Sequence, residues 1–250
     1  INLSINNQLE KYLNKFNDIN LLDITKSNKV LLIFVASIIL FLSYLSIPHI
    51  YDKLEVRKEL ENQIFNRFNL NLTLNKDFNY KFYPRPHFII KESFLLVDGK
   101  KISNIKDTRI FVSLSNLFSL KDIIIKDIIV ENTNFNLDKN SSSFFLKILD
   151  NNFLESNFVI KNSNIFFKNS EKKVMFINKI KNMKYYYDAK ELKNIAFSES
   201  EIFNIPYSIL FHKDKNKKIF TKINLDFLKF QIQNSFDYSN NLKKGKAHIL

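Results

Sequence analysis

The sequence predicts a mainly β protein with one N-terminal transmembrane helix. The β part is expected to be an extended, curved, mostly antiparallel sheet, a β-groove, with a few short helices. Three observations predict this. Residues 30–47 carry no charge, the apolar period changes to two after Asn69, and a ten-residue apolar pattern recurs three times.

The uncharged run from Val30 to Ile47 is long enough to cross a bilayer. Eighteen residues of helix extend about 27 Å, which is close to the thickness of the hydrocarbon layer. A core helix would show a polar face, and a signal peptide would lack some thirty polar residues in front of it. We therefore expect residues 29–48 to form an uncleaved transmembrane helix and residues 1–28 a cytoplasmic tail.

Lysine and arginine are balanced on the two sides of this run, so the positive-inside rule does not set its orientation. The short N-terminal tail and the long C-terminal part favour a cytoplasmic N-terminus. The next segment, residues 49–69, is expected to be an amphipathic helix. Its apolar residues recur every four positions, at Val56, Leu60, Ile64 and Phe68.

The recurring pattern begins at Phe88, Ile128 and Phe158. Each copy has three residues that are mostly apolar, a charged residue, a polar residue, Ser or Thr, and a second apolar stretch. The later two copies align without gaps at an offset of thirty residues. Each copy predicts a strand, a polar kink and a second strand, and such units favour an extended architecture. Chance similarity in a chain rich in Asn, Ile, Lys and Phe is the alternative.

Strand-like alternation continues over residues 70–250, which we expect to be one β-rich domain that is truncated at its C-terminal end. β-Branched and aromatic residues dominate the strands, and Asn, Asp, Lys and Ser mark the turns. Residues 144–154 are expected to hold a short helix.

The composition excludes several classes of site. With Gly 2 the chain has no phosphate-binding glycine loop, and with Cys 0 it has no disulfide and no thiolate site. The four histidines are not at metal-ligand spacing. We find no catalytic constellation, and we expect no enzyme activity, no metal and no cofactor. The net charge of +13 suits nucleic acid, but the lysines are spread along the chain and the membrane segment argues against that partner.

The order of these parts resembles the N-terminal region of the AsmA-like family, which includes the TamB and YhdP type proteins of the Gram-negative envelope. The resemblance rests on the anchor and helix, on the aromatic and proline passage 82–90, on the strand and turn passage 110–130, and on residues 160–167. The chain departs from the family where Asn71 and Asn75 replace glycines.

The resemblance implies inner-membrane anchoring, a periplasmic body, and a function in outer-membrane and envelope assembly by carrying phospholipid along an apolar groove. The implied partners are the membrane, phospholipid and other envelope proteins. An alternative is a single-pass envelope scaffold whose β-domain docks another protein. The candidate groove-lining residues, for which an ordinary closed β-core is the alternative, are Ile110, Val112, Leu114, Ile123, Ile125, Val130, Phe135, Leu137, Ile160 and Ile165.

Overall fold

The computed structural model describes residues 29–151, 153–154, 156–213, 218–237 and 244–249. The expected cytoplasmic tail, residues 1–28, lies outside the described residues. The chain divides into two compact units, residues 1–47 and residues 48–250. Each unit is described by itself.

The first unit contributes helix α3 (Lys29–Ser46), and the 3₁₀ helix η1 (Ile47–Ile50) follows it. By length and composition the stretch Lys29–Ile50 is able to cross a membrane. Its large apolar side chains are exposed, as at Val30 and Leu40, which are 80% and 70% exposed. The helix predicted over residues 29–48 is therefore present.

The second unit begins with helix α4 (Lys53–Phe68). The Asp52 carboxylate accepts hydrogen bonds from the backbone N–H groups of Leu54 and Glu55, at 2.9 and 3.0 Å, and so caps the helix. Asn69 ends the helix in the left-handed conformation, with φ 47°. Because of the Asp52 cap, α4 begins at Lys53, later than the expected start at residue 49.

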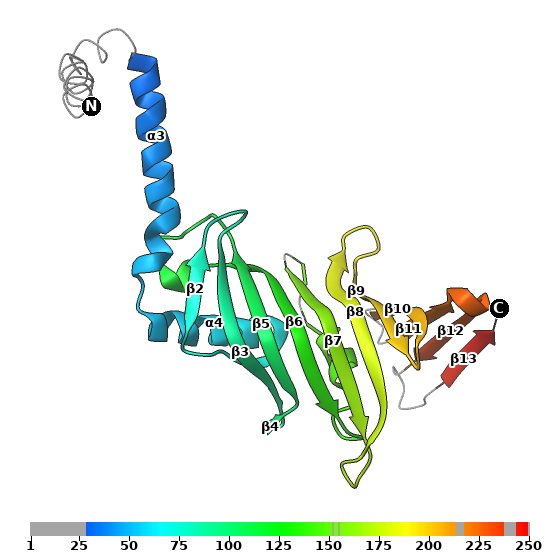
Figure 1. Ribbon diagram of the computed structural model, residues 1–250. Helices are drawn as coiled ribbons and strands as arrows, with labels where there is room; N and C mark the ends of the chain where they lie inside the picture. The colour runs from blue at the N-terminus through cyan, green and yellow to red at the C-terminus, as the bar shows by residue number, and fades with distance from the viewer. Residues whose placement is uncertain (1–28, 152, 155, 214–217, 238–243, 250) are drawn as a thin grey trace, which may run out of the picture. The chain divides into compact units, whose positions relative to one another are not determined.

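Most of the described residues after α4 belong to one 13-stranded sheet (Figure 1). The strands pair in the order β1-β3-β5-β6-β7-β8-β9-β10-β11-β12-β13, and β2 and β4 both pair with β3. Every neighbouring pair is antiparallel except β6 and β7, so the predicted mainly β, mostly antiparallel architecture is confirmed. The strands are β1 (Asn71–Thr73), β2 (Phe78–Lys81), β3 (His87–Val97), β4 (Lys100–Lys101), β5 (Ser103–Val112), β6 (Ile125–Leu137), β7 (Asn157–Lys168), β8 (Val174–Asp188), β9 (Lys193–Ile202), β10 (Ile205–Lys213), β11 (Lys218–Leu225), β12 (Phe230–Asp237) and β13 (Lys244–Ile249).

The parallel pair places two copies of the repeat side by side. Ile128 of β6 lies opposite Phe158 of β7, and Leu137 lies opposite Phe167, so the offset of thirty residues is the pairing register. Two parallel neighbours need a long crossover between them. Residues 138–156 make this crossover, and it contains the short helix α5 (Phe144–Ile148).

The polar kink predicted for each repeat copy is a residue in the left-handed conformation. Glu92, Asn132 and Asn162 have φ values of 57°, 54° and 46° and stand at the same position of the three copies, in β3, β6 and β7. In a strand, side chains alternate between faces, and one extra residue resets that alternation. The buried residues accordingly change phase at each kink, as in β6, where burial falls on Val130 and then on Thr133. Both halves of each strand thereby direct their apolar residues to the same face.

Helix α4 and the 138–156 crossover cover this inner face over the first half of the sheet. The apolar stripe of α4 is fully buried, with Val56, Leu60, Ile64 and Phe68 at most 1% exposed. The rings of Phe68 and Phe153 lie 5.7 Å apart and connect helix to crossover. In Figure 1, α4 and the crossover lie on the far side of β3–β7.

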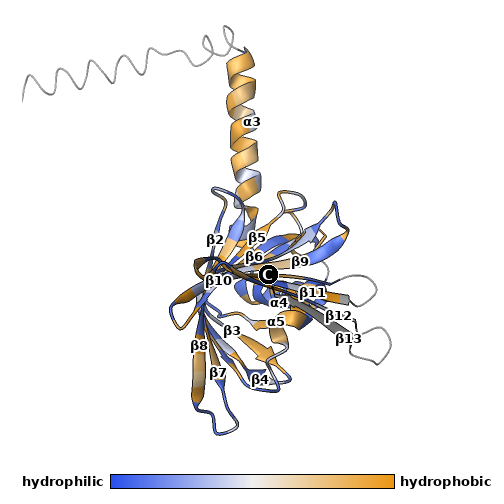
Figure 2. Ribbon diagram, turned by 90° about the vertical axis from the view of Figure 1, so that its right-hand side faces the viewer, coloured by the Kyte–Doolittle hydropathy of each residue, from blue (hydrophilic) through white to orange (hydrophobic). Residues whose placement is uncertain are grey.

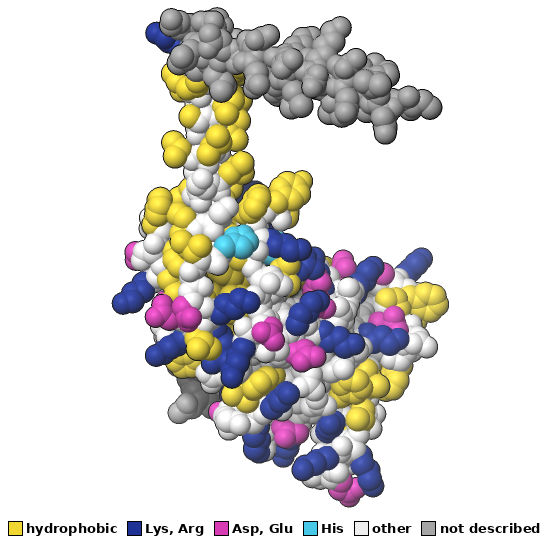
Figure 3. All heavy atoms as spheres, turned by 60° about the vertical axis from the view of Figure 1, so that its left-hand side comes forward, with side chains coloured by type: hydrophobic (Ala, Val, Ile, Leu, Met, Phe, Trp, Pro, Cys, Tyr) yellow, Lys and Arg dark blue, Asp and Glu magenta, His cyan; other side chains and the backbone are white. Residues whose placement is uncertain are grey.

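Charged and amide side chains occupy the outer face of the same strands. Arg109 pairs with Glu131 at 2.5 Å, and Lys91 pairs with Asp107. The hydrogen bond from Lys91 lowers the pKa of the Asp107 carboxyl. Figure 3 shows Lys and Arg interspersed with Asp and Glu over one face of the body, which is typical of a solvated surface.

The left-handed residue of β7 provides a test of the phase argument. Asn162→Val should lower the free energy of unfolding by about 1–2 kcal/mol, because a β-branched residue is strained at positive φ. Asn162→Gly should cost much less, because glycine adopts that conformation freely. Chemical denaturation would measure both. Equal destabilisation by the two variants would contradict this account of the kink.

The covering helix provides a second test. Ile64→Ala removes a side chain that is 0% exposed and should destabilise the body by about 2–5 kcal/mol. Its matched control is Phe65→Ala on the same helix, where the side chain is 46% exposed and the loss should be small. Comparable losses in the two variants would show that α4 does not cover the sheet as described.

Candidate functional site

The structure brings most of the predicted groove residues together on the inner face of β5, β6 and β7. All of them except Leu114 are buried, with exposed fractions of 0 to 5%. Leu114 lies apart from them, in the β5–β6 loop, and is 50% exposed. Ile123 also lies in this loop but is buried. The buried set has the burial of ordinary core residues, and its contact with lipid stays a prediction.

The crossover seals these residues from solvent. The ring of Phe135 lies 5.2 Å from that of Phe145, and the Tyr185 hydroxyl donates to the Phe145 carbonyl at 3.0 Å. Tyr185 is itself buried, and this burial raises the pKa of its hydroxyl well above the usual value. These contacts hold the crossover on the inner face. Lipid could therefore reach the predicted groove residues of β5–β7 only if the crossover moved away.

The inner face continues beyond the covered strands. Side chains that lie opposite one another on paired strands point to the same face of a sheet. One cross-strand row therefore runs along the inner face from the covered part to β12, through Phe78, Ile90, Thr108, Val130, Ile160, Met183, Ser198, Ile209, Ile223 and Ile232.

The part of the inner face on β10–β12, which we call the open face, is apolar but not buried. Every described side chain from Tyr207 to Lys213 is only partly buried, whereas β3–β7 alternate between buried and exposed residues. The same holds for residues 219–225 and 230–234. This is the burial of a single-layer sheet. The open face consists of Tyr207, Ile209, Phe211, Ile219, Thr221, Ile223, Leu225, Phe230, Ile232 and Asn234.

The opposite face of the same three strands is mainly polar. Between the residues of the open face stand Ser208, Leu210, His212, Phe220, Lys222, Asn224, Gln231, Gln233 and Ser235. The rings of His212 and Phe220 stack on that side at 4.7 Å. Since one face is apolar and the other polar, the strands are built for contact with water on one side only.

A short polar step separates the covered core from the open face. The Tyr207 hydroxyl donates to Asn178 Oδ1 at 2.8 Å, and the hydroxyls of Ser198 and Ser200 lie 2.7 Å apart. Burial raises the pKa of Tyr207, although hydrogen bonds with Ser200 and Asn178 offset part of the effect. Tyr207 thus presents its ring to the open face while its hydroxyl is satisfied at the boundary.

Residues 149–151 of the crossover are held at this boundary by side chains of β9 and β10. The Asn194 amide donates to the carbonyls of Leu149 and Asn151, at 2.8 and 2.6 Å. Lys213 pairs with Asp150. These contacts define where the cover ends and where the open face begins. The strands beyond it are rotated relative to β3–β7, as Figures 1 and 2 show.

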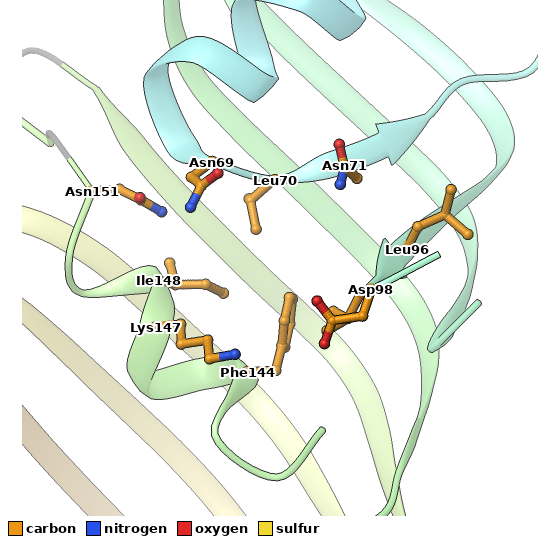
Figure 4. A pocket seen from close by; sticks show the side chains of 10 residues that line it. Asn69, Leu70, Asn71, Leu96, Asp98, Phe144, Lys147, Ile148 and Asn151 are labelled. Carbon is orange, nitrogen blue, oxygen red and sulfur yellow. The ribbon is translucent and has the colours of Figure 1, made fainter. Parts of the chain in front are cut away.

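A pocket between α4, β3 and α5 is a weaker candidate site (Figure 4). It has a volume of about 170 Å³, and its lining includes Asn69, Asp98, Phe144, Lys147 and Asn151. Sites for drug-sized ligands are usually about 300–1,000 Å³, so this pocket is small for such a ligand. Its mixed lining does not suit an acyl chain.

Two larger depressions lie elsewhere on the body. One, of about 370 Å³, is formed by the β3–β4 turn and the start of the crossover and has a largely polar lining. The other, of about 390 Å³, lies at the ends of β8 and β9 and is lined by exposed apolar residues together with the ion pair between Lys179 and Glu201, at 2.9 Å. Neither holds an arrangement of side chains suited to catalysis.

Within the described part of the chain, no group of three or more His, Asp or Glu residues could hold a metal ion. No family model matches this chain, and no curated protein is significantly similar to it. The candidate site therefore rests on the geometry of the open face.

The sequence pattern does not mark the open face as a site. Ile219, Thr221, Ile223 and Leu225 alternate as in a strand, and that alternation is the available signal. It does not distinguish an open strand from a covered one, because both alternate. Only the position of the crossover, whose residues 149–151 reach as far as β9 and β10, separates them.

The polar step provides a test at Tyr207. Tyr207→Phe should lower the free energy of unfolding by about 1–3 kcal/mol, because it leaves Asn178 without its hydroxyl donor. Tyr83→Phe is the control, since Tyr83 is 80% exposed. The folded-state pKa of Tyr207 lies above the usual 10.0, so stability should fall as pH rises past that value. The fall should be smaller in Tyr207→Phe, and an identical pH profile would contradict the boundary role.

Proposed function

We propose that this protein is a membrane-anchored, AsmA-like lipid-handling protein of the Gram-negative inner membrane, with its body in the periplasm. It carries phospholipid for envelope and outer-membrane assembly. The observation that supports the proposal is the open face, a row of apolar side chains that the described parts of the chain leave only partly buried. Helix α3, which is long and apolar enough to span a membrane, supports the anchor.

The open face suits an acyl chain for a simple physical reason. Removing a methylene group from water is favourable by about 0.8 kcal/mol, which is about a fourfold gain in partitioning for each group. An apolar face on extended strands offers part of this gain to each methylene group that lies against it. Binding and release would then need no covalent step, and transfer would be partitioning along the sheet.

The proposal moves the lipid contacts from the residues predicted by the sequence to β10–β12. The predicted residues of β5–β7 lie under α4 and the crossover, so they stabilise the sheet. The open face continues the same rows of side chains without a cover. In this arrangement the covered strands β3–β7 hold the strands of the open face, β10–β12, in place through the continuous sheet.

The second candidate is a single-pass envelope scaffold whose body docks another protein. The same open face favours it, because an apolar, partly exposed sheet face also suits the apolar surface of a protein partner. The two candidates differ in what occupies the face.

A photocrosslinking experiment tests both. Benzoylphenylalanine would replace Ile223 on the open face and, as the matched control, the adjacent Lys222 on the polar face of the same strand. Irradiation of the full chain in its host membrane should give phospholipid adducts at position 223 and few at position 222, as read by mass spectrometry. Protein adducts at position 223 in place of lipid would favour the scaffold. Equal adducts at both positions would contradict a specific face.

A further inference from the structure

The tethered end of the body exposes a cluster of large apolar side chains that the open face does not use. We call it the end patch, and its members come from three separate segments. They are Ile50 at the end of η1 and Leu54 at the start of α4, Phe82 and Tyr83 in the β2–β3 turn, and Leu114 and Phe118 in the β5–β6 loop, with exposed fractions of 82%, 58%, 39%, 80%, 50% and 74%.

The three segments meet at one end of the sheet. The Val112 backbone N–H donates to the Pro86 carbonyl at 3.0 Å, which joins the β2–β3 turn to the end of β5. The Tyr51 hydroxyl donates to the Leu117 carbonyl at 2.5 Å and joins the start of α4 to the β5–β6 loop. In Figure 1 the β2–β3 turn and the β5–β6 loop lie at the same end of β3 and β5.

The end patch is held rigidly by the residues behind it. Arg85 stacks on the ring of Phe111 at 4.5 Å and pairs with Asp127 at 2.9 Å, which fixes the β2–β3 turn. Leu117 is 0% exposed and anchors the β5–β6 loop between Leu114 and Phe118. The exposed residues therefore lie on turns that are held in place before binding. Little conformational entropy should be lost when these residues bind a partner.

The identity of the partner follows from the connectivity of the chain. Tyr51 is four residues after Ile47, the last residue of the helical unit, so the end that carries Tyr51 is the tethered one. Aromatic side chains are enriched where a protein meets the bilayer interface. The exposed charges on the same segments have both signs, with Lys53, Lys81 and Lys121 beside Asp52 and Asp122. Insertion of apolar side chains, and not attraction between charges, is therefore the expected mode of contact with lipid.

We propose that the end patch inserts into the bilayer surface and docks the body onto the membrane that α3 enters. This inference rests on the proposed anchor. Docking by apolar insertion would fix the orientation of the strands relative to the bilayer. The open face would then lie at a fixed height and angle to the membrane surface. A tether alone would leave the body free to turn.

The absence of cysteine from the sequence makes a direct test possible. Ser115→Cys places a single thiol in the β5–β6 loop, and Ser170→Cys places one in the β7–β8 turn at the opposite end of the sheet. Each full-length variant would carry a small fluorophore in phosphatidylcholine vesicles that contain lipid with a nitroxide on the acyl chain. The label at position 115 should be quenched and the label at position 170 should not.

A second pair of variants distinguishes docking of the end patch from the mere closeness of the body to the membrane that its link to α3 imposes. Tyr83→Ser with Phe118→Ser should reduce quenching at position 115 to the level seen at position 170. Met175→Ser with Phe203→Ser, two exposed apolar residues at the opposite end, should leave it unchanged. All four substituted side chains are exposed, so thermal unfolding of the body should be the same in each variant.

The outcomes are distinct. Extraction of the chain from the vesicles by alkaline carbonate would overturn the anchor and with it the proposed function. Retention of the chain with no quenching at position 115, or with quenching that the Tyr83 and Phe118 variant does not change, would overturn docking alone. Quenching that high salt abolishes would also overturn it, because apolar insertion is not screened.

Discussion

A long β-strand must keep its apolar residues on one face, and the sheet of this protein depends on how that alternation is maintained. Strands β3, β6 and β7 each contain 11 to 13 residues, and in each a left-handed residue resets the phase halfway along. Without Glu92, Asn132 and Asn162 at these positions, half of each strand would direct its apolar side chains to water. Two of the three are Asn, which is among the few residues other than glycine that tolerate this conformation well, so a chain with two glycines builds these kinks without glycine.

The single parallel pair has a comparable effect on the architecture. Because β6 and β7 run in the same direction, the chain must cross from one end of the sheet to the other between them, and it does so over the inner face. The crossover brings Phe144, Ile148 and Phe153 onto that face and converts the first half of the sheet into a closed core. From β9 to β13 the neighbouring strands pair antiparallel, and the described segments of the chain leave the inner face of β10–β12 only partly buried.

Membrane attachment and ligand binding would be served by different parts of one body. The closed core holds α4 and the turns of the end patch in place, while the open face lies farther along the sheet. A body docked by its tethered end would hold the strands in one orientation to the bilayer. In that arrangement the rows of inner side chains run across the strands from β2 and β3 to the open face on β10–β12, and lipid handling would use this continuity.

Much of this architecture could be read from the sequence, because it depends on local periodicity. The apolar helix, the amphipathic helix with Val56, Leu60, Ile64 and Phe68 on one side, the alternating strands and the repeat with its polar kink are all local patterns, and the structure has each of them. Which of two identical alternations is covered is not local. Ile160 and Ile223 both look like inner-face residues, yet one lies beneath the crossover and the other on the open face, since only tertiary structure decides where residues 138–156 pack. The end patch is likewise a product of the fold, because its residues are brought together by the pairing of β2, β3 and β5 and by the contact of Tyr51 with the β5–β6 loop.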